Sequence, residues 1–266
     1  MLLPMTNEPF LDTAIAAALA AGRLQRSRFA TDFTIDHKGA KDLVTELDTS
    51  SEALIVSMLL DRFPSHGILA EEGSYPTGDG RHRWIIDPID GTTNFAHGFP
   101  WFCSSIALER DGQLQAGVIY NPINDELFCA TAGGGAFLNG RRIKVSQRSP
   151  LSASLLGTGF PYDCATHPEN NFGAFIRFQM AARGIRRAGA AALDLAYLAA
   201  GRLDGFWEVK LKPWDVAAGT LLVQEAGGTV TAFDGTPYQI FNHRILASNG
   251  LIHQEMIDLL AQGVSP

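Results

Sequence analysis

The segment Trp84-Ile85-Ile86-Asp87-Pro88-Ile89-Asp90-Gly91-Thr92-Thr93-Asn94-Phe95 joins an apolar run to two aspartates and a Gly-Thr-Thr turn. The apolar run predicts a buried strand that ends at Asp87, and side chains at a strand end are free to converge on a ligand. Pro88 fixes its own φ and favours an extended Asp87, which stiffens the peptide between the carboxylates. Carboxylate oxygens on a stiff loop suit Mg²⁺. A second interpretation stays open: Asp90-Gly91 is a turn and Asp87 caps a helix.

Composition describes an ordinary globular protein of 266 residues, 46% hydrophobic and 18% charged. The net charge of −7 disfavours nucleic acid as the main partner. The apolar stretch Ile15–Ala21 lacks a preceding basic region, and no apolar run reaches the roughly 18 residues of a membrane span. Cys103, Cys129 and Cys164 are too widely spaced for a zinc site or disulfide framework. This cysteine usage fits a reducing cytoplasm, which is the expected location.

The pattern along the chain changes near residue 148. Before it we expect a helix over about 8–28, a helix opened by a capping box at Thr49–Glu52, a strand at Ile68–Ala70 and hairpins from 102 to 145. After it, strands at 154–158, 205–208 and 245–247 alternate with helices near 169–183, 191–200, 214 and the C-terminus. This predicts a mixed α+β first half and an α/β second half, as subdomains 1–147 and 148–266 packed as one unit.

Four acidic residues each follow an apolar strand-like run or open a helix: Glu71, Asp87, Asp90 and Asp215. Each one alone also fits a turn or a helix cap, and Asp215 would complement the dipole of the helix it opens. If the four converge, their like charges raise one another's pKa unless cations are present. Two metal ions about 4 Å apart clamp the attacking and leaving oxygens of a phosphoryl transfer. The cluster therefore predicts a metal-dependent phosphoryl-transfer site.

Three motifs together resemble the signatures of the inositol monophosphatase family: Ala70–Gly73, Asp87–Phe95 and Pro213–Gly219. Gly39–Asp48 is similar to the mobile-loop segment of that family, and Gln224–Gly228 to its characteristic helix end. The resemblance spans about residues 8 to 260, in the order and spacing of the family. It implies a layered αβαβα sandwich of the inositol monophosphatase and fructose-1,6-bisphosphatase type, usually a homodimer.

The resemblance also implies a role for each matching residue. Glu71, Asp87 and the carbonyl of Ile89 would hold a first metal, and Asp87 would bridge to a second one completed by Asp90 and Asp215. A third, looser ion near Glu71 would generate hydroxide. The catalytic residues would be Thr92, Asp48 and Glu71, with Thr92 hydrogen-bonded to Asp48 and positioning the attacking water. Gly91, Thr92 and Thr93 would cradle the phosphate through backbone N–H groups.

The substrate side of the site resembles the family at Gly189, Ala190, Ala191 and Glu208, while Asp90 and Asp215 would also accept hydroxyl hydrogen bonds. A carboxylate at 208 accepts from vicinal hydroxyls and so selects for them. The alternative for Glu208 is an acidic residue facing solvent at a strand end. Lys38 matches a metal-proximal lysine in the family's lid, and the alternative there is a solvated lysine in a polar loop.

The expected function is a Mg²⁺-dependent phosphomonoesterase that hydrolyses inositol monophosphate with two or three ions and is inhibited by Li⁺. The same scaffold hosts phosphatases for histidinol phosphate, fructose 1,6-bisphosphate and 3′-phosphoadenosine 5′-phosphate. A different class also stays open: an interaction protein in transcription or ribosome assembly that retains the fold. A Rossmann-type dinucleotide binder is excluded because no Gly-x-Gly-x-x-Gly follows a strand.

Overall fold

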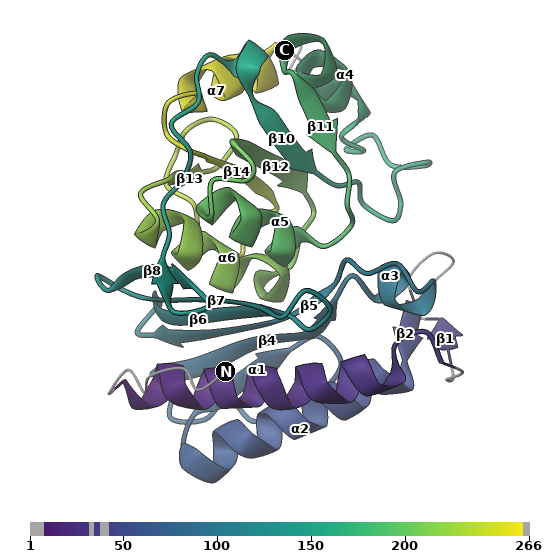
Figure 1. The fold of residues 1–266 in the computed structure, drawn as a ribbon, viewed down its shortest axis with the longest axis vertical. Helices are drawn as coiled ribbons and strands as arrows, with labels where there is room; N and C mark the ends of the chain where they lie inside the picture. Colours follow the sequence, from purple (N-terminus) through teal and green to yellow (C-terminus); the bar gives the residue numbers. More distant parts are fainter. Residues whose placement is uncertain (1–7, 32–34, 38–42, 263–266) are drawn as a thin grey trace.

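The computed structural model describes residues 8–31, 35–37 and 43–262 (Figure 1). Lys38 and the part of the Gly39–Asp48 motif before residue 43 lie outside these residues. Within the described ranges no helix is long and apolar enough to span a membrane.

Figure 1 shows helices and sheets stacked in five layers. Helices α1 (Pro9–Arg28) and α2 (Glu46–Arg62) cover one face of the larger sheet, and α5 (Ala191–Ala199) and α6 (Pro213–Glu225) lie between the two sheets. Helices α4 (Phe172–Ala181) and α7 (His253–Ala261) form the outer layer on the smaller sheet. The predicted αβαβα sandwich is confirmed.

The larger sheet has seven strands in the order β3-β4-β5-β6-β7-β8-β9 among the described residues. Its strands are β3 (Gly67–Ala70), β4 (His82–Asp90), β5 (Cys103–Arg110), β6 (Gln113–Asn121), β7 (Glu126–Thr131), β8 (Gly135–Leu138) and β9 (Arg141–Arg142). Only β3 and β4 pair in parallel; the remaining pairs are antiparallel. Asp111 and Gly112 both have positive φ, 50° and 78°, which is the turn that a two-residue hairpin needs.

The smaller sheet has the order β11-β10-β12-β14-β13. Its strands are β10 (Leu155–Thr158), β11 (Gly184–Arg186), β12 (Gly205–Val209), β13 (Thr229–Thr231) and β14 (Arg244–Ser248). Strand β10 runs parallel to both of its neighbours, and β14 runs antiparallel to β12 and β13. A separate hairpin pairs β1 (Ile35–His37) with β2 (Leu43–Thr45), and short helices α3 (Thr92–Ala96) and η1 (Leu151–Ala153) complete the described elements.

The start of α2 differs from the sequence prediction. The predicted capping box at Thr49–Glu52 is wrong, because α2 begins four residues earlier, at Glu46, with Thr45 as its N-cap. The Thr45 Oγ1 accepts from the Leu47 N–H at 3.2 Å, and Asp48 Oδ2 accepts from the Thr45 N–H at 2.7 Å. Thr45–Asp48 and Thr49–Glu52 have the same spacing of hydroxyl and carboxylate, and the upstream pair caps the helix.

Strand β4 does not end at Asp87 as predicted but continues to Asp90. The pairing with β5 shifts register between these residues, since Asp87 faces Ser105 and Asp90 faces Cys103. In a regular strand residues three apart point to opposite faces, and a bulge with one extra residue brings them back to the same side. Pro88 has no N–H to donate to the ladder, so the irregularity falls where pairing is already lost.

One buried cluster joins both halves of the chain. It is built around α5 and α6 and includes Ile119 and Phe128 of the larger sheet together with Phe206 and Ala247 of the smaller one. A second cluster lies between the larger sheet and α1 with α2, and a third lies under α4 and α7. The division into 1–147 and 148–266 stays a prediction.

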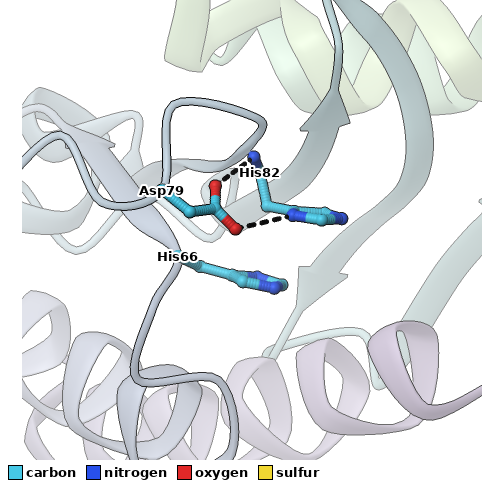
Figure 2. Close-up of side chains that lie close together, drawn as sticks. All are labelled: His66, Asp79 and His82. Atoms are coloured by element: carbon cyan, nitrogen blue, oxygen red, sulfur yellow. Dashed lines mark hydrogen bonds and ion pairs between the residues drawn. The ribbon is translucent and has the colours of Figure 1, made fainter.

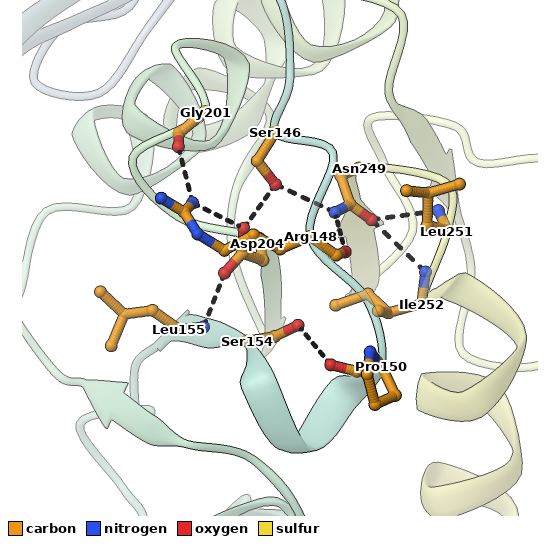
Figure 3. A network of polar contacts seen from close by, with 10 residues as sticks. All are labelled: Ser146, Arg148, Pro150, Ser154, Leu155, Gly201, Asp204, Asn249, Leu251 and Ile252. Carbon is orange, nitrogen blue, oxygen red and sulfur yellow. Dashed lines mark hydrogen bonds and ion pairs between the residues drawn. The ribbon is translucent and has the colours of Figure 1, made fainter.

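The connection from the larger to the smaller sheet is held by a polar network around Asp204, a buried residue just before β12 (Figure 3). Ser146 and Arg148 of the connection both donate to Asp204 Oδ1, and the Leu155 N–H donates to its Oδ2 at 2.7 Å. Asn249 donates to Ser146 Oγ at 3.0 Å and to the Arg148 carbonyl at 2.9 Å. These bonds fix the path of the chain between the two sheets.

Candidate active site

Four acidic residues meet between the two sheets. Glu71 follows β3, Asp87 and Asp90 lie on β4, and Asp215 is the third residue of α6. Burial raises the pKa of Asp87 well above its usual range, and the charges of Glu71, Asp90 and Asp215 raise it further. Burial and neighbouring carboxylates also raise the pKa of Asp90 and of Asp215 to about 7 each. The structure therefore brings together the four residues that the sequence singled out.

This donor set fits a hard divalent cation. Asp87 is 2% exposed, and its Oδ1 has no hydrogen-bond partner among the described residues. Asp215 Oδ2 accepts from the Lys212 N–H at 2.7 Å, so the predicted capping of α6 holds as well. Buried carboxylate oxygens without donors are stabilised by ions such as Mg²⁺, which take oxygen ligands. The residues that would hold such ions are Glu71, Asp87, Asp90, Asp215 and the carbonyl of Ile89.

Thr92 and Asp48 are hydrogen-bonded beside the acidic cluster, as predicted. Thr92 Oγ1 lies 2.9 Å from Asp48 Oδ1 and 3.0 Å from the Ile89 carbonyl oxygen. The other carboxylate oxygen of Asp48 accepts from the N–H and the hydroxyl of Thr45, at 2.7 and 2.5 Å. Asp48 is fully buried. The N-cap of α2 thus holds Asp48 in the position that orients the Thr92 hydroxyl; their catalytic roles stay predictions.

Gly91 forms the turn between β4 and α3. Its φ is +97°, which favours glycine, and a Cβ there would lie 3.0 Å from the Trp101 carbonyl oxygen. The first N–H groups of a helix have no partner inside it, so Thr92 and Thr93 present backbone donors next to Asp90. The Thr93 side chain is exposed. This geometry is compatible with the predicted phosphate cradle of Gly91, Thr92 and Thr93.

The segment Gly189–Ala191 reaches the acidic cluster through the start of α5. Asp90 Oδ2 accepts from the Ala192 N–H at 2.7 Å, and the backbone of Ala191 also hydrogen-bonds to Asp90. Asn94 Nδ2 donates to the carbonyls of Trp101 and Ala188 at 2.7 and 2.9 Å, which ties this segment to the turn after β4. The predicted substrate residues Gly189, Ala190 and Ala191 therefore lie beside the predicted metal ligands.

Glu208 lies on β12 and is buried, at 8% exposure. The alternative of a solvent-facing carboxylate at a strand end is therefore wrong. Burial raises its pKa well above the usual range, the charges of Asp194 and Asp215 add to this, and Arg187 acts in the opposite direction. A Cβ at position 159 would lie 2.1 Å from Glu208 Oε1, so Gly159 provides the space for this carboxylate.

Sequence reasoning missed Gln25, which supports the bulge of β4 from α1. Its Nε2 donates to the Pro88 carbonyl at 2.8 Å and to Ser104 Oγ at 2.9 Å, and Ser104 Oγ donates to the same carbonyl at 2.9 Å. Gln25 is completely buried on the alanine face of α1. In the sequence, Gln25 is a single amide side chain among the apolar residues on the buried face of the predicted helix.

Asp194 was missed for a similar reason. It is the lone acidic residue of α5, it is 2% exposed, and its Oδ1 has no hydrogen-bond partner among the described residues. Burial raises its pKa well above the usual range, and the charge of Asp90 adds to this while Arg187 lowers it. The charges of Asp194 and Glu208 thus extend the acidic cluster towards Arg187.

The sequence profile described as the inositol monophosphatase family matches residues 6–265. The chain belongs to this family. The inositol-1-monophosphatase of Mesorhizobium japonicum is 44% identical over 98% of this chain and 99% of its own length. The Nus factor SuhB of Pseudomonas aeruginosa is 44% identical over 97% of this chain and 98% of its own. The solved inositol monophosphatase of Anabaena superposes with a TM-score of 0.89, at 47% identity and 98% coverage of both chains.

Membership confirms the resemblance drawn from the three motifs and the enzyme class that it implied. The family is one of metal-dependent phosphatases, in agreement with the oxygen-rich donor set around Asp87.

Proposed function

We propose that this chain is a Mg²⁺-dependent phosphomonoesterase that hydrolyses inositol monophosphate to inositol and phosphate. The observation that carries the proposal is the meeting of Glu71, Asp87, Asp90 and Asp215 beside the Thr92–Asp48 hydrogen bond. Relatives named inositol-1-monophosphatase at 44% and 46% identity support the choice of substrate.

The bound ions would neutralise charge on the phosphate and lower the pKa of a coordinated water. Thr92 shares its single hydroxyl proton with Asp48 and the Ile89 carbonyl, so its oxygen lone pairs remain available to a water molecule. Thr92 thereby orients the attacking water, and Asp48 keeps the Thr92 hydroxyl in that orientation. The backbone N–H groups of Gly91, Thr92 and Thr93 bind the phosphate oxygens.

Glu208 and the Gly189–Ala191 segment select the alcohol part of the substrate. Glu208 accepts hydrogen bonds from neighbouring hydroxyls, and a buried carboxylate left without them disfavours substrates that lack such hydroxyls. The small side chains at 189–191 let backbone groups approach the ring. Asp90 and Asp215 accept from hydroxyls on the metal side.

Several finer features belong to the same proposal. The site would hold two or three Mg²⁺ ions, Asp87 would be shared between two of them, and Li⁺ would inhibit by displacing one. The chain acts in the cytoplasm as a homodimer, on a small phosphate monoester and not on nucleic acid. Residues 1–147 form the metal- and phosphate-binding subdomain, and 148–266 supply Asp215 and the substrate pocket.

Phosphate release measured with Mg²⁺ on four substrates tests the choice among phosphatases. The substrates are inositol 1-phosphate, histidinol phosphate, fructose 1,6-bisphosphate and 3′-phosphoadenosine 5′-phosphate. We expect the highest kcat/KM for inositol 1-phosphate. A higher value for histidinol phosphate would overturn the proposed substrate while leaving the phosphatase chemistry in place.

The relative named Nus factor SuhB favours a second candidate, an interaction protein in transcription or ribosome assembly that keeps the fold. Asp90→Asn separates the two functions, because it removes a proposed metal ligand without changing side-chain size. If a cellular phenotype of deleting the chain is rescued by Asp90→Asn as well as by the wild type, hydrolysis is not the biological role. Failure of Asp90→Asn to rescue supports the enzyme.

A further inference from the structure

Two histidines and an aspartate cluster at the ends of β3 and β4 that lie away from the acidic site. They are His66, Asp79 and His82 (Figure 2). We propose that His66 and His82, with Asp79 orienting the His82 ring, bind a second kind of metal ion, a divalent transition ion of the zinc class. The proposal is independent of the phosphatase function.

The sheet register places the two histidines side by side. Strands β3 and β4 are parallel and pair Gly67 with Arg83, so His66, just before β3, and His82, the first residue of β4, are neighbours. Their rings stack with centroids 4.4 Å apart and an angle of 6° between the planes. One ring nitrogen of each histidine and one carboxylate oxygen of Asp79 all lie within 4.8 Å of one another.

The loop that carries Asp79 is locked against the start of β3. The Asp79 N–H donates to the Ser65 carbonyl at 2.7 Å. Gly78 has a φ of +68°, and a Cβ there would lie 2.1 Å from the Gly67 nitrogen. A Cβ at Gly67 would in turn lie 2.3 Å from the Thr77 carbonyl oxygen. This close packing holds the backbone of the three residues in place before any ion binds, so that only the imidazole rings need to turn towards it.

His66 is buried and has one ring nitrogen without a hydrogen bond to the described residues. It is 8% exposed, and its Nδ1 is buried with no hydrogen-bond partner among the described residues. Burial lowers the pKa of His66, and the charge of His82 lowers it further, so at neutral pH the ring is in the neutral form that binds metals. Phe63 stacks on His66 at 4.9 Å, and Phe10 lies at 5.6 Å. This apolar wall strengthens electrostatic interactions inside the cluster.

Asp79 orients His82 in the way that carboxylates orient zinc-bound histidines. Its Oδ2 lies 2.9 Å from His82 Nδ1, while its Oδ1 accepts from the N–H groups of Arg81 and His82, both at 2.8 Å. A carboxylate on one ring nitrogen leaves the other nitrogen as the metal ligand. Because a ring lone pair lies in the ring plane, the two stacked rings must tilt towards each other to reach Zn–N distances of about 2.0–2.1 Å.

The donor set separates this site from the acidic one. Imidazole nitrogens favour zinc, copper and nickel, whereas Mg²⁺ prefers oxygen. His66 precedes Glu71 by five positions, and His82 precedes Asp87 by five. At about 3.3 Å per residue along a strand, the two sites lie roughly 16 Å apart. The ion would therefore link His66, just before β3, to His82 at the start of β4 and take no part in hydrolysis.

A Co²⁺ titration of the full-length protein tests the proposal. Excess Mg²⁺ is present throughout to occupy the oxygen ligands of the acidic site. Co²⁺ absorbs visible light strongly when few ligands, some of them nitrogen atoms, surround it, so its absorption reports binding to the histidines. We expect one such Co²⁺ per chain, displaced by Zn²⁺. His66→Gln and His82→Gln should each abolish the absorption or weaken Co²⁺ binding at least tenfold, and Asp79→Asn should weaken it by about 10–100-fold.

His243→Gln is the matched control, because His243 is exposed and distant in the sequence from the cluster. It should bind Co²⁺ like the wild type. Circular dichroism and Mg²⁺-dependent phosphate release show whether each variant is folded; if His66→Gln does not fold, His82→Gln and Asp79→Asn decide. The absence of a visible Co²⁺ band in the wild type would overturn the proposal, as would equal Co²⁺ affinity in the folded variants.

Discussion

Asp48 serves two purposes at one position of α2. One carboxylate oxygen accepts from the Thr45 backbone and completes the N-cap, and the other accepts from the Thr92 hydroxyl. A substitution at Asp48 would therefore disturb the helix start and the site together. Thr92 separates the two effects, because its side chain takes no part in capping α2.

Thr92→Val replaces the hydroxyl by a methyl group of similar size. We expect kcat for inositol 1-phosphate to fall by about 100–10,000-fold, the range of a lost proton-positioning group, while the melting temperature changes little. Thr49→Val is the control, because Thr49 is exposed on α2 and its hydroxyl donates to the Glu46 carbonyl, within its own helix. Equal rates for Thr92→Val and Thr49→Val would contradict the role of Thr92.

Glu208→Gln tests the selection of the alcohol part. The amide keeps the size of the buried carboxylate but loses one acceptor and the negative charge. We expect kcat/KM for inositol 1-phosphate to fall at least tenfold, while p-nitrophenyl phosphate, which has no vicinal hydroxyls, is affected less than threefold, as the logic of hydroxyl recognition predicts. If both substrates lose the same factor, Glu208 acts on structure or metal binding and not on specificity.

At the scale of elements, β4 depends on a bulge that brings Asp87 and Asp90 to the same side, and α1 braces this bulge through Gln25. Gln25→Leu removes both donors and keeps the volume. We expect about tenfold weaker binding of Mn²⁺, measured directly by its electron paramagnetic resonance signal, and a matching rise in the Mg²⁺ needed for half-maximal activity.

Arg26→Gln is the control on the same helix, because Arg26 is exposed. Gln25→Asn should restore Mn²⁺ binding only in part, since its amide is one methylene shorter. If Gln25→Leu lowers the melting temperature and leaves Mn²⁺ affinity unchanged, Gln25 supports the core and does not position the metal ligands.

Most of the longer helices and strands followed from the sequence, because apolar periodicity and turn residues are local signals, but the short strands β1, β2, β11 and β13 did not. The helix predicted over about 8–28 is α1 (Pro9–Arg28), and one of the hairpins predicted between 102 and 145 turns at Asp111-Gly112. The start of α2 was not predicted, since two threonine–carboxylate pairs of the same spacing follow each other and tertiary contacts decide between them. Glu52 of the rejected box instead accepts from the Glu72 N–H and the Tyr75 hydroxyl.

The acidic residues of the site were found because each stands at the end of a local pattern. Gln25 and Asp194 were not, because their roles depend on partners far along the chain. Gln25 donates to the Pro88 carbonyl, and the charge of Asp90 raises the pKa of Asp194. The bulge was also invisible, since register is set by the pairing of β4 with β5 and not by either strand alone.

In the whole molecule, the acidic site forms where the larger sheet meets the two helices that lie between the sheets. Asp90 on the larger sheet accepts from the first N–H groups of α5, and Asp215 arrives on α6, so both helices between the sheets contribute to it. Burying these carboxylates together makes the stability of the metal-free chain depend on pH.

Because the pKa values of Asp90 and Asp215 are raised in the folded chain, its stability falls as the pH rises. The folded chain holds protons on Asp90 and Asp215, each with a pKa of about 7, that the unfolded chain releases at its ordinary pKa of about 4. The contribution of Asp90 and Asp215 to the free energy of unfolding in EDTA is therefore greatest below about pH 4. This contribution is lost as the pH rises through about 7.

Melting temperatures measured from pH 5 to 8 in EDTA and in Mg²⁺ test this dependence. We expect the EDTA-treated wild type to lose stability with rising pH relative to Asp87→Asn, which carries one charge fewer, and Mg²⁺ to restore stability most strongly at pH 8. A difference between wild type and Asp87→Asn that does not change over this range would contradict the account of the cluster.

We propose that the four carboxylates hold the ions for phosphate ester hydrolysis. The most direct test is the hydrolysis of inositol 1-phosphate by EDTA-stripped protein before and after Mg²⁺ is added, for the wild type and Asp87→Asn. We predict no hydrolysis without Mg²⁺, full recovery in the wild type when it is added, and a loss of at least about 1,000-fold in Asp87→Asn, as expected when a metal-based step is removed. Hydrolysis by the stripped wild type, or Mg²⁺-restored activity in Asp87→Asn near that of the wild type, would contradict it.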